Sequence, residues 1–178
     1  MLCAGAVFEV FRDTSPIVEP LSVDEAFLDV GGLRGIRGTP VEIAARLRER
    51  VRTEVGLPIT VGVARSKFLA KVASAVGKPD GLLIVEPERE EAFLLPLPVE
   101  RLWGVGRRTS ETLHAAGLAT VGDIADTPLP RLHALVGVAA GSHLQQLALG
   151  HDPRPVTPVR EEKSLGAERT FQTDVADT

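Results

Sequence analysis

The sequence predicts an α+β or α/β fold, in which a mixed sheet with helices is followed by a small all-α unit. Up to residue 95, short runs rich in Val, Ile and Leu alternate with stretches of helical periodicity, which is typical of an α/β layer. After Pro96-Leu97-Pro98 the elements are short, helical and separated by Gly or Pro. These two observations divide the chain near residue 97.

The first predicted elements are a helix and two short strands. Residues 6–12 have the pattern of the last turns of a helix, so the chain begins within an element. Residues 17–21 form an apolar stretch between two prolines, and residues 26–30 form a second strand that ends at Gly31-Gly32.

A helix with complete start and stop signals follows. Thr39 to Glu42 is a capping box with Pro40 at the first helical position. Apolar residues then recur every four positions from Ile43 to Val55, and Gly56 lies just past the end. We therefore expect one helix that starts at Pro40 and ends before Gly56.

The body continues as strand, helix, turn, strand and helix. Residues 59–64 are a β-branched run suited to a buried strand, and Ser66 is placed to cap a helix that Gly77 closes. One face of that helix carries Phe68, Leu69, Val72 and Val76. The later elements are the turn Lys78-Pro79-Asp80-Gly81, a strand over 82–85 and a helix over 88–95.

The all-α unit is predicted to contain four short helices. They cover residues 107–116, 120–125, 129–136 and 142–149. Residues 152–158 have the composition of an extended, Pro-rich linker, and residues 163–171 resemble one strand of a further domain.

Composition excludes several classes of protein. The formal net charge of −4 is not that of a chain with an overall basic footprint for nucleic acid, although residues 101–160 carry six Lys and Arg against four Asp and Glu. The single cysteine, Cys3, excludes an internal disulfide. No apolar run reaches the roughly 18 residues of a membrane span. We expect a cytoplasmic protein without a membrane partner.

Asp24 and Glu25 are adjacent carboxylates between two strand-like segments. Such a pair repels itself unless a cation is present, and Mg²⁺ prefers hard oxygen ligands that it shares with substrate phosphates. Neighbouring side chains on a regular strand point to opposite faces, so these two converge only at a strand end or bend. The alternative is a pair of solvated turn residues, and the sequence leaves this open.

Three of the four lysines, Lys67, Lys71 and Lys78, fall within twelve positions. Lys67 and Lys71 are four residues apart on one helical face, and Lys78 follows the end of that helix. The cluster suits phosphate groups, with each Lys acting as a point cation. The alternative is a solvated helix face, which is the usual reason for lysines spaced four residues apart.

The turn Gly104-Val105-Gly106 precedes a predicted helix that starts with Arg107-Arg108. Backbone N–H groups in such a turn can bind a phosphate. The pattern lacks the preceding strand and the third Gly of the dinucleotide-binding fingerprint, and it fits a helix-hairpin-helix, which grips the DNA backbone without reading bases. A helix–helix turn that needs Gly for steric reasons is the alternative.

In this order the motifs resemble one family, the Y-family DNA polymerases, and within it the DinB type. Residues 18–30, 60–74 and 78–81 resemble the palm, and Val105-Gly106 with its surroundings resembles the helix-hairpin-helix of the thumb. Residues 163–171 are similar to the first strand of the little finger. The resemblance implies a partial palm over 1–97, a thumb over 98–152, a linker over 153–162 and a truncated little finger over 163–178.

The resemblance also implies a role for each matching residue. Asp24 and Glu25 are the catalytic carboxylates and metal ligands of a two-metal nucleotidyl-transfer site, with Mg²⁺ as the cofactor. Lys78 contacts the triphosphate of the incoming dNTP. The implied DNA-binding residues are Gly104, Gly106, Arg107 and Arg169.

The implied function is template-directed synthesis past damaged DNA, from dNTPs on primer-template DNA, by a nucleoid-associated enzyme. In the family, a first catalytic Asp and an aromatic residue that excludes ribonucleotides precede the palm motif, and nothing before Asp24 matches that Asp. We therefore expect a chain truncated at both ends that does not polymerise by itself. A sliding clamp is a further expected partner, bound through C-terminal residues that this sequence lacks.

Two other functions stay open at this stage. One is a non-catalytic, polymerase-like accessory protein that binds DNA, although such a scaffold has no need to keep adjacent carboxylates. The other is an ordinary nucleotide-binding α/β domain, which predicts ATP binding without DNA binding. Salt-dependent affinity for DNA separates these two.

Overall fold

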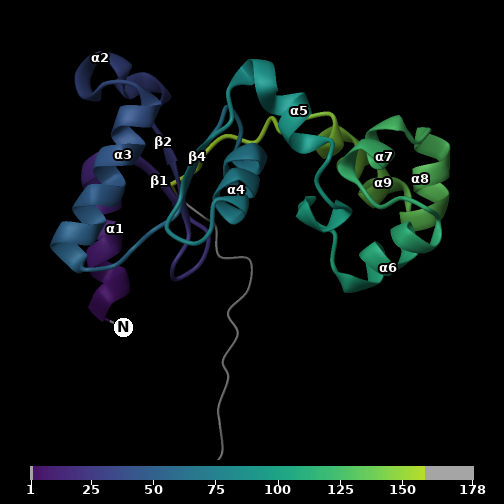
Figure 1. Cartoon of the computed structure of the whole chain (residues 1–178), viewed down its shortest axis with the longest axis horizontal. Helices are drawn as coiled ribbons and strands as arrows, with labels where there is room; N and C mark the ends of the chain where they lie inside the picture. The colour runs from purple at the N-terminus through teal and green to yellow at the C-terminus, as the bar shows by residue number, and fades with distance from the viewer. Residues whose placement is uncertain (1, 159–178) are drawn as a thin grey trace, which may run out of the picture.

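The computed structural model describes residues 2–158 and consists of two lobes that meet at helix α4 (Figure 1). The first lobe begins with α1 (Leu2–Thr14), which packs against α3 (Pro40–Arg50). Val7, Val10 and Phe11 of α1 are buried in one core with Leu47 and Val51. The helix expected over residues 6–12 is therefore present and longer.

Helix α3 begins as its sequence signals predict. The Thr39 hydroxyl accepts a hydrogen bond from the Glu42 amide at 3.3 Å, and the Glu42 carboxylate accepts one from the Thr39 amide at 2.8 Å. The helix does not run evenly to Gly56, because residues Val51–Val55 form a π-helical turn. Gly56 then ends the segment at φ +78°, a conformation that favours glycine.

The strands form two separate pairs within the described part of the chain. β1 (Ile17–Pro20) is antiparallel to β2 (Ala26–Asp29), with Val18 opposite Leu28. β3 (Val61–Val63) is parallel to β4 (Leu82–Ile84), with Gly62 opposite Leu83. An antiparallel pair and a parallel pair are thus both present, and the α+β class is confirmed. Each strand is shorter than its apolar run in the sequence.

Helix α4 (Lys67–Val76) connects β3 to β4 and lies directly on β3. Ser66 caps it by accepting a hydrogen bond from the Leu69 amide at 3.4 Å, as expected from the sequence. Gly62 is needed here, because a side chain at this position would collide with the α4 backbone at Ala70 and Ser74. One expected core residue, Val76, lies at the end of the helix and is 39% exposed.

The second lobe is helical, and it includes the helix expected over residues 88–95, which the sequence placed in the preceding α/β body. It consists of α5 (Glu90–Leu94), α6 (Arg107–Ala115), α7 (Val121–Asp126), α8 (Leu129–Val136) and α9 (Val138–Ala148). Short 3-10 turns cover Pro87–Arg89 and Val99–Arg101. Helix α9 starts four residues earlier than expected, because Gly137 at φ +90° both ends α8 and begins α9.

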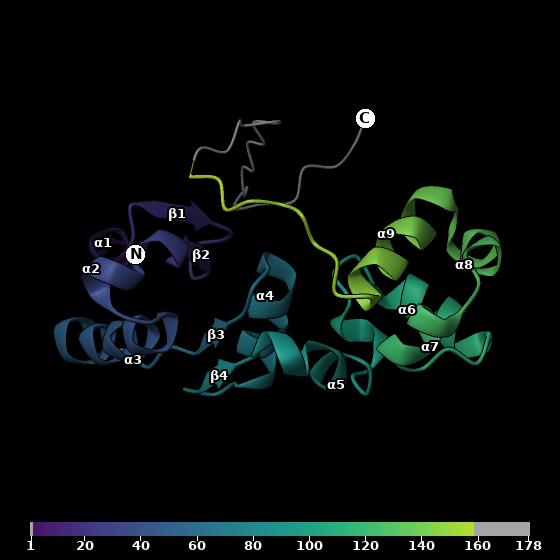
Figure 2. The same cartoon turned by 90° about the horizontal axis from the view of Figure 1, so that it is seen from above.

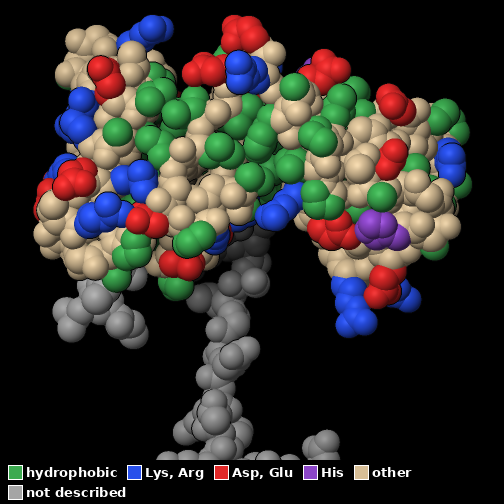
Figure 3. Space-filling view, in the orientation of Figure 1, with side chains coloured by type: hydrophobic (Ala, Val, Ile, Leu, Met, Phe, Trp, Pro, Cys, Tyr) green, Lys and Arg blue, Asp and Glu red, His purple; other side chains and the backbone are tan. Residues whose placement is uncertain are grey.

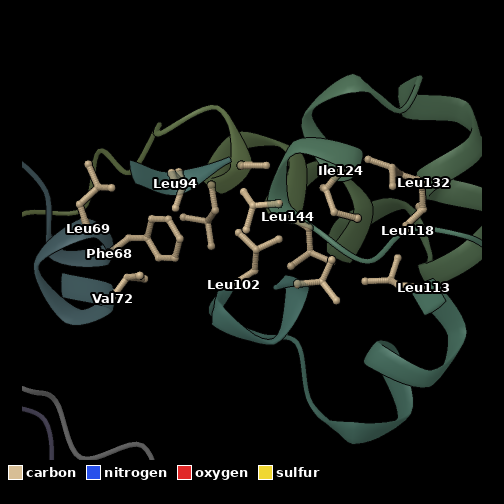
Figure 4. Close-up of a cluster of buried hydrophobic side chains, with 14 residues drawn as sticks. Phe68, Leu69, Val72, Leu94, Leu102, Leu113, Leu118, Ile124, Leu132 and Leu144 are labelled. Atoms are coloured by element: carbon tan, nitrogen blue, oxygen red, sulfur yellow. The ribbon is translucent and has the colours of Figure 1, made fainter. Parts of the chain in front are cut away.

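The core of the helical lobe extends into α4 (Figure 4). Phe68, Leu69 and Val72 of α4 are buried in the same cluster as Leu94 and Leu113. The change of pattern at residue 97 therefore does not coincide with the division between the two cores, which falls between α3 and α4. The domain limits stay predictions.

Three small elements of the described chain have no counterpart among the expected ones. They are the 3-10 turns at Gly31–Leu33 and Val99–Arg101 and the one-turn helix α2 (Arg34–Arg37), and all three lack a side-chain cap. The strand expected over residues 163–171 lies outside the described residues.

Candidate functional site

A cleft of about 1350 Å³ opens between the two strand pairs and brings the predicted polar residues together. Its walls include Asp24, Glu25, Lys67, Lys71 and Lys78. Apolar side chains from β2, β3 and the adjoining loops form much of the rest. Figure 3 shows apolar side chains gathered over the middle of the molecule.

Asp24 and Glu25 lie in the loop that joins β1 to β2. The Leu21 amide donates to the Glu25 carbonyl at 2.8 Å, which closes the loop just before Ala26 starts β2. Asp24 is exposed and accepts a hydrogen bond from the Ser22 hydroxyl at 2.6 Å. Because both residues precede the regular strand, the alternation of strand side chains does not apply to them.

Each lysine of the predicted cluster has a different environment. Lys71 donates to Glu25 Oε2 at 2.8 Å, and Lys67 forms a mostly buried ion pair with Glu19 at 2.6 Å. Lys78 is exposed at the cleft and forms no ion pair within residues 2–158. Of the three lysines, only Lys78 therefore lies at this cleft without an ion pair among the described residues.

The carboxylates have the donor chemistry that a hard divalent cation requires. Mg²⁺ is commonly held by one or two carboxylates together with substrate phosphates and waters, and Asp24 with Glu25 supplies such a pair at an open cleft. Among the described residues, no group of three or more His, Cys, Asp or Glu is placed to hold a metal ion. The two carboxylates thus fit a cation that completes its shell with other ligands.

The turn at Gly104 and Gly106 has the conformation of a hairpin between helices. Gly104 adopts φ +102°, and Gly106 is the N-terminal cap residue of α6 without any side-chain cap. Both glycines are exposed, and a side chain at Gly106 would meet no atom within 4 Å. The first amides of α6 therefore face open space, which suits a phosphate oxygen.

The two arginines that follow the turn differ in their contacts. Arg107 is paired along α6 with Glu111 at 2.9 Å, and both side chains are well exposed. Arg108 forms no ion pair among the described residues. Arg169, the remaining predicted DNA contact, lies outside the described residues.

Trp103 connects this turn to the carboxylate loop, a contact that sequence reasoning missed. Its ring centre lies 6.1 Å from that of Phe27, in β2, two residues after Glu25. The Lys71 ammonium is 5.9 Å from the Trp103 ring centre. Trp103 directly precedes the Gly turn in the sequence, but Phe27 is 76 positions away, so no local pattern indicates their contact.

A polar network ties α6 to the 3-10 turn that precedes the Gly turn. The Glu100 carboxylate accepts hydrogen bonds from the Ser110 hydroxyl and, at 2.7 Å, from His114 Nε2. These two hydrogen bonds, of which the one from Ser110 has the larger effect, lower the pKa of Glu100 to about 2. The carboxylate therefore stays ionised and holds the helix beside the Gly turn.

Two family models match the chain. Residues 3–75 match the impB/mucB/samB family, and residues 87–118 match the IMS family HHH motif. The second match covers the turn at Gly104 and Gly106. In the described residues, every helix is too short or too polar to cross a membrane.

Individual relatives agree with these families. The DNA polymerase IV 2 of Mesorhizobium japonicum is 48% identical over 163 residues, which are 92% of this chain and 39% of that protein. The crystal structure of DinB from Sulfolobus solfataricus superposes with a TM-score of 0.79 at 26% identity, over 87% of this chain and 46% of that one. An insertion ternary complex of Dbh DNA polymerase superposes with a TM-score of 0.79 at 26% identity, over 87% of this chain and 45% of that one. The chain spans less than half the length of these relatives.

Proposed function

The chain belongs to the Y-family DNA polymerases of the DinB type, and from this premise we propose that the whole protein carries out template-directed DNA synthesis past damaged DNA. The reaction is nucleotidyl transfer from a dNTP to a primer end. Divalent metal use follows from the family, and we propose Mg²⁺ as the ion.

The observation that carries the proposal is the shared cleft of Asp24, Glu25 and Lys78. Asp24 and Glu25 would hold the metal, which, when bound, stabilises the charge that develops on the attacking and leaving oxygens. Lys78, exposed and without an ion pair among the described residues, would bind the triphosphate as a point cation. Lys71 compensates the charge of Glu25 and so keeps the adjacent carboxylates from repelling each other.

Primer-template DNA is the proposed second substrate. Gly104 and Gly106 would offer backbone amides to DNA phosphates, and Arg107 adds positive charge beside them. A ternary complex among the similar solved structures supports both DNA and nucleotide as ligands. A sliding-clamp partner and association with the nucleoid stay predictions.

Primer extension by the full-length gene product tests the proposal. We expect Asp24→Ala to abolish extension while the fold is retained, because the side chain is exposed and hydrogen-bonds only to Ser22 within the described part of the chain. Glu88→Gln, a change at an exposed carboxylate outside the cleft, is the control and should extend normally. Retained extension in Asp24→Ala would refute the metal assignment.

A further inference from the structure

The segment of residues 152–157, here called the strap, returns from the helical lobe to the first lobe. It leaves the end of α9, passes over the start of α4 and reaches β1 (Figure 2). Its composition predicts an extended linker, yet three groups of side-chain contacts hold it in place.

The first contact is at Asp152, whose side chain is only 1% exposed. Its carboxylate accepts a hydrogen bond from the Phe68 amide at 3.0 Å, in the first turn of α4, and pairs with Arg154 at 2.6 Å. Burial raises the pKa of Asp152, but the bonds from Arg154 and Phe68 outweigh it, so the pKa lies below its ordinary value. The strap therefore supplies a charged cap to the helix that carries Lys67 and Lys71.

The second contact is the ion pair of Glu19 and Lys67, whose side chains are 16% and 10% exposed. Glu19 Oε2 also accepts the Thr157 amide at 2.7 Å, and Lys67 donates to the Pro155 carbonyl at 3.2 Å. Glu19 and Lys67 thus each hydrogen-bond to the backbone of the strap. Because the ion pair is largely buried, salt screens their attraction only weakly.

The third contact lies on the helical lobe. The Arg154 guanidinium lies 4.5 Å from the centre of the Trp103 ring. Trp103 is the residue that precedes Gly104. Trp103 in turn packs against Phe27, next to the carboxylate loop. The strap thus touches α4, β1 and the Gly turn at once.

We propose that the strap is a brace that fixes the spacing between the carboxylates Asp24 and Glu25 and the Gly104–Gly106 turn. The inference rests on the proposed function. The lobes are also joined through the core around α4 and through the contact of Trp103 with Phe27, and residues 152–156 of the strap line the cleft itself. Glu19, Asp152 and Arg154 are accordingly positioning residues, since nucleotidyl transfer depends on placing the primer end to within about 1 Å.

Distances between the lobes, measured without DNA or nucleotide, test the brace. Spin labels at Glu49→Cys on α3 and Asp126→Cys on α7, with Cys3→Ser, report the spacing in the 178-residue chain; both label sites are exposed. We expect Glu19→Gln with Asp152→Asn to broaden the distance distribution clearly. Glu88→Gln, the matched control, should leave it unchanged. An unchanged distribution in the double variant would overturn the proposal.

A milder variant covers the case in which the double variant does not fold. Arg154→Met removes a side chain that is 41% exposed, leaves Asp152 bonded to Phe68, and should broaden the distribution to a smaller extent. The same distribution as in the control would overturn the brace.

Kinetics of the full-length protein give a second readout. We expect the double variant to lower kcat for primer extension by about 10- to 100-fold, while Kd for primer-template DNA stays within about twofold. A weaker Kd with unchanged kcat would contradict the positioning role. If Asp24→Ala retains extension, the proposed function fails, but the distance measurements still decide whether the brace exists.

Discussion

The Lys71 ammonium lies 2.8 Å from Oε2 of Glu25, so a carboxylate proposed to bind a metal already has a cation beside it. Both side chains are partly exposed, at 33% and 41%, and an ion pair of this kind exchanges easily with solvent and ions. Lys71 therefore competes with a divalent cation for Glu25.

Lys71→Gln is expected to strengthen metal binding. Removal of the competing charge should lower the Kd for Mn²⁺ alone by about two- to fivefold, the range that corresponds to a partly exposed ion pair. Electron paramagnetic resonance of added Mn²⁺ measures this directly. Lys78→Gln, which removes a lysine without a contact to Glu25, is the control. Weaker binding in Lys71→Gln would show that this lysine supports the site in another way.

Gly106→Ala separates DNA contact from folding. The added methyl group meets no atom within 4 Å and the backbone, at φ −87°, accepts any residue, so the free energy of unfolding should change by less than about 0.5 kcal/mol. The methyl group would stand where a DNA phosphate approaches, and affinity for primer-template DNA should fall several-fold. Fluorescence anisotropy measures the affinity, and unaltered binding would argue against a backbone contact at this turn.

Gly104→Ala, unlike Gly106→Ala, should lower the stability of the fold. At φ +102° an alanine is strained by about 1–3 kcal/mol, although space for its side chain exists. Urea denaturation should therefore show a lower free energy of unfolding than for Gly106→Ala. Equal stability of the two variants would mean that the turn adjusts its backbone.

The Glu100 network predicts a pH dependence in the helical lobe. The folded-state pKa of about 2 lies below the ordinary value of 4.5, so the stabilisation is present above pH 4.5 and is lost as the pH falls toward 2. In Glu100→Gln this part of the acid sensitivity should be absent. Urea denaturation of both proteins between pH 2 and 6 measures the difference. A Glu100 carboxyl that titrates near 4.5 by NMR would contradict the network.

Phe68→Ala tests the shared core. The side chain is 1% exposed and packs with residues of the helical lobe, so its truncation should cost about 3–5 kcal/mol of unfolding free energy. Val76→Ala on the same helix, at a position 39% exposed, should cost less than about 1 kcal/mol. Both values come from urea denaturation, and similar losses would place α4 outside that core.

Local signals in the sequence were sufficient for most elements. The capping box at Thr39, the cap at Ser66 and the stop at Gly56 each act within a few residues, so their pattern predicts the starts of α3 and α4 and the end of the π-helical turn that follows α3. The one-turn helix α2 carries no such cap and was missed. The early start of α9 was missed as well, because the sequence does not reveal that Gly137 joins two helices directly.

In the candidate site, too, some features follow from the sequence and others only from the tertiary structure. The sequence by itself determined the adjacent carboxylates, the lysines, the Gly turn and, through their order, the family. Only the tertiary structure decided that Lys71 neutralises Glu25, that Lys67 serves Glu19, and that the strap closes on both lobes. These contacts join residues 46, 48 and up to 138 positions apart. Ion pairs and hydrogen bonds over such separations depend on how the elements pack, and no local pattern records them.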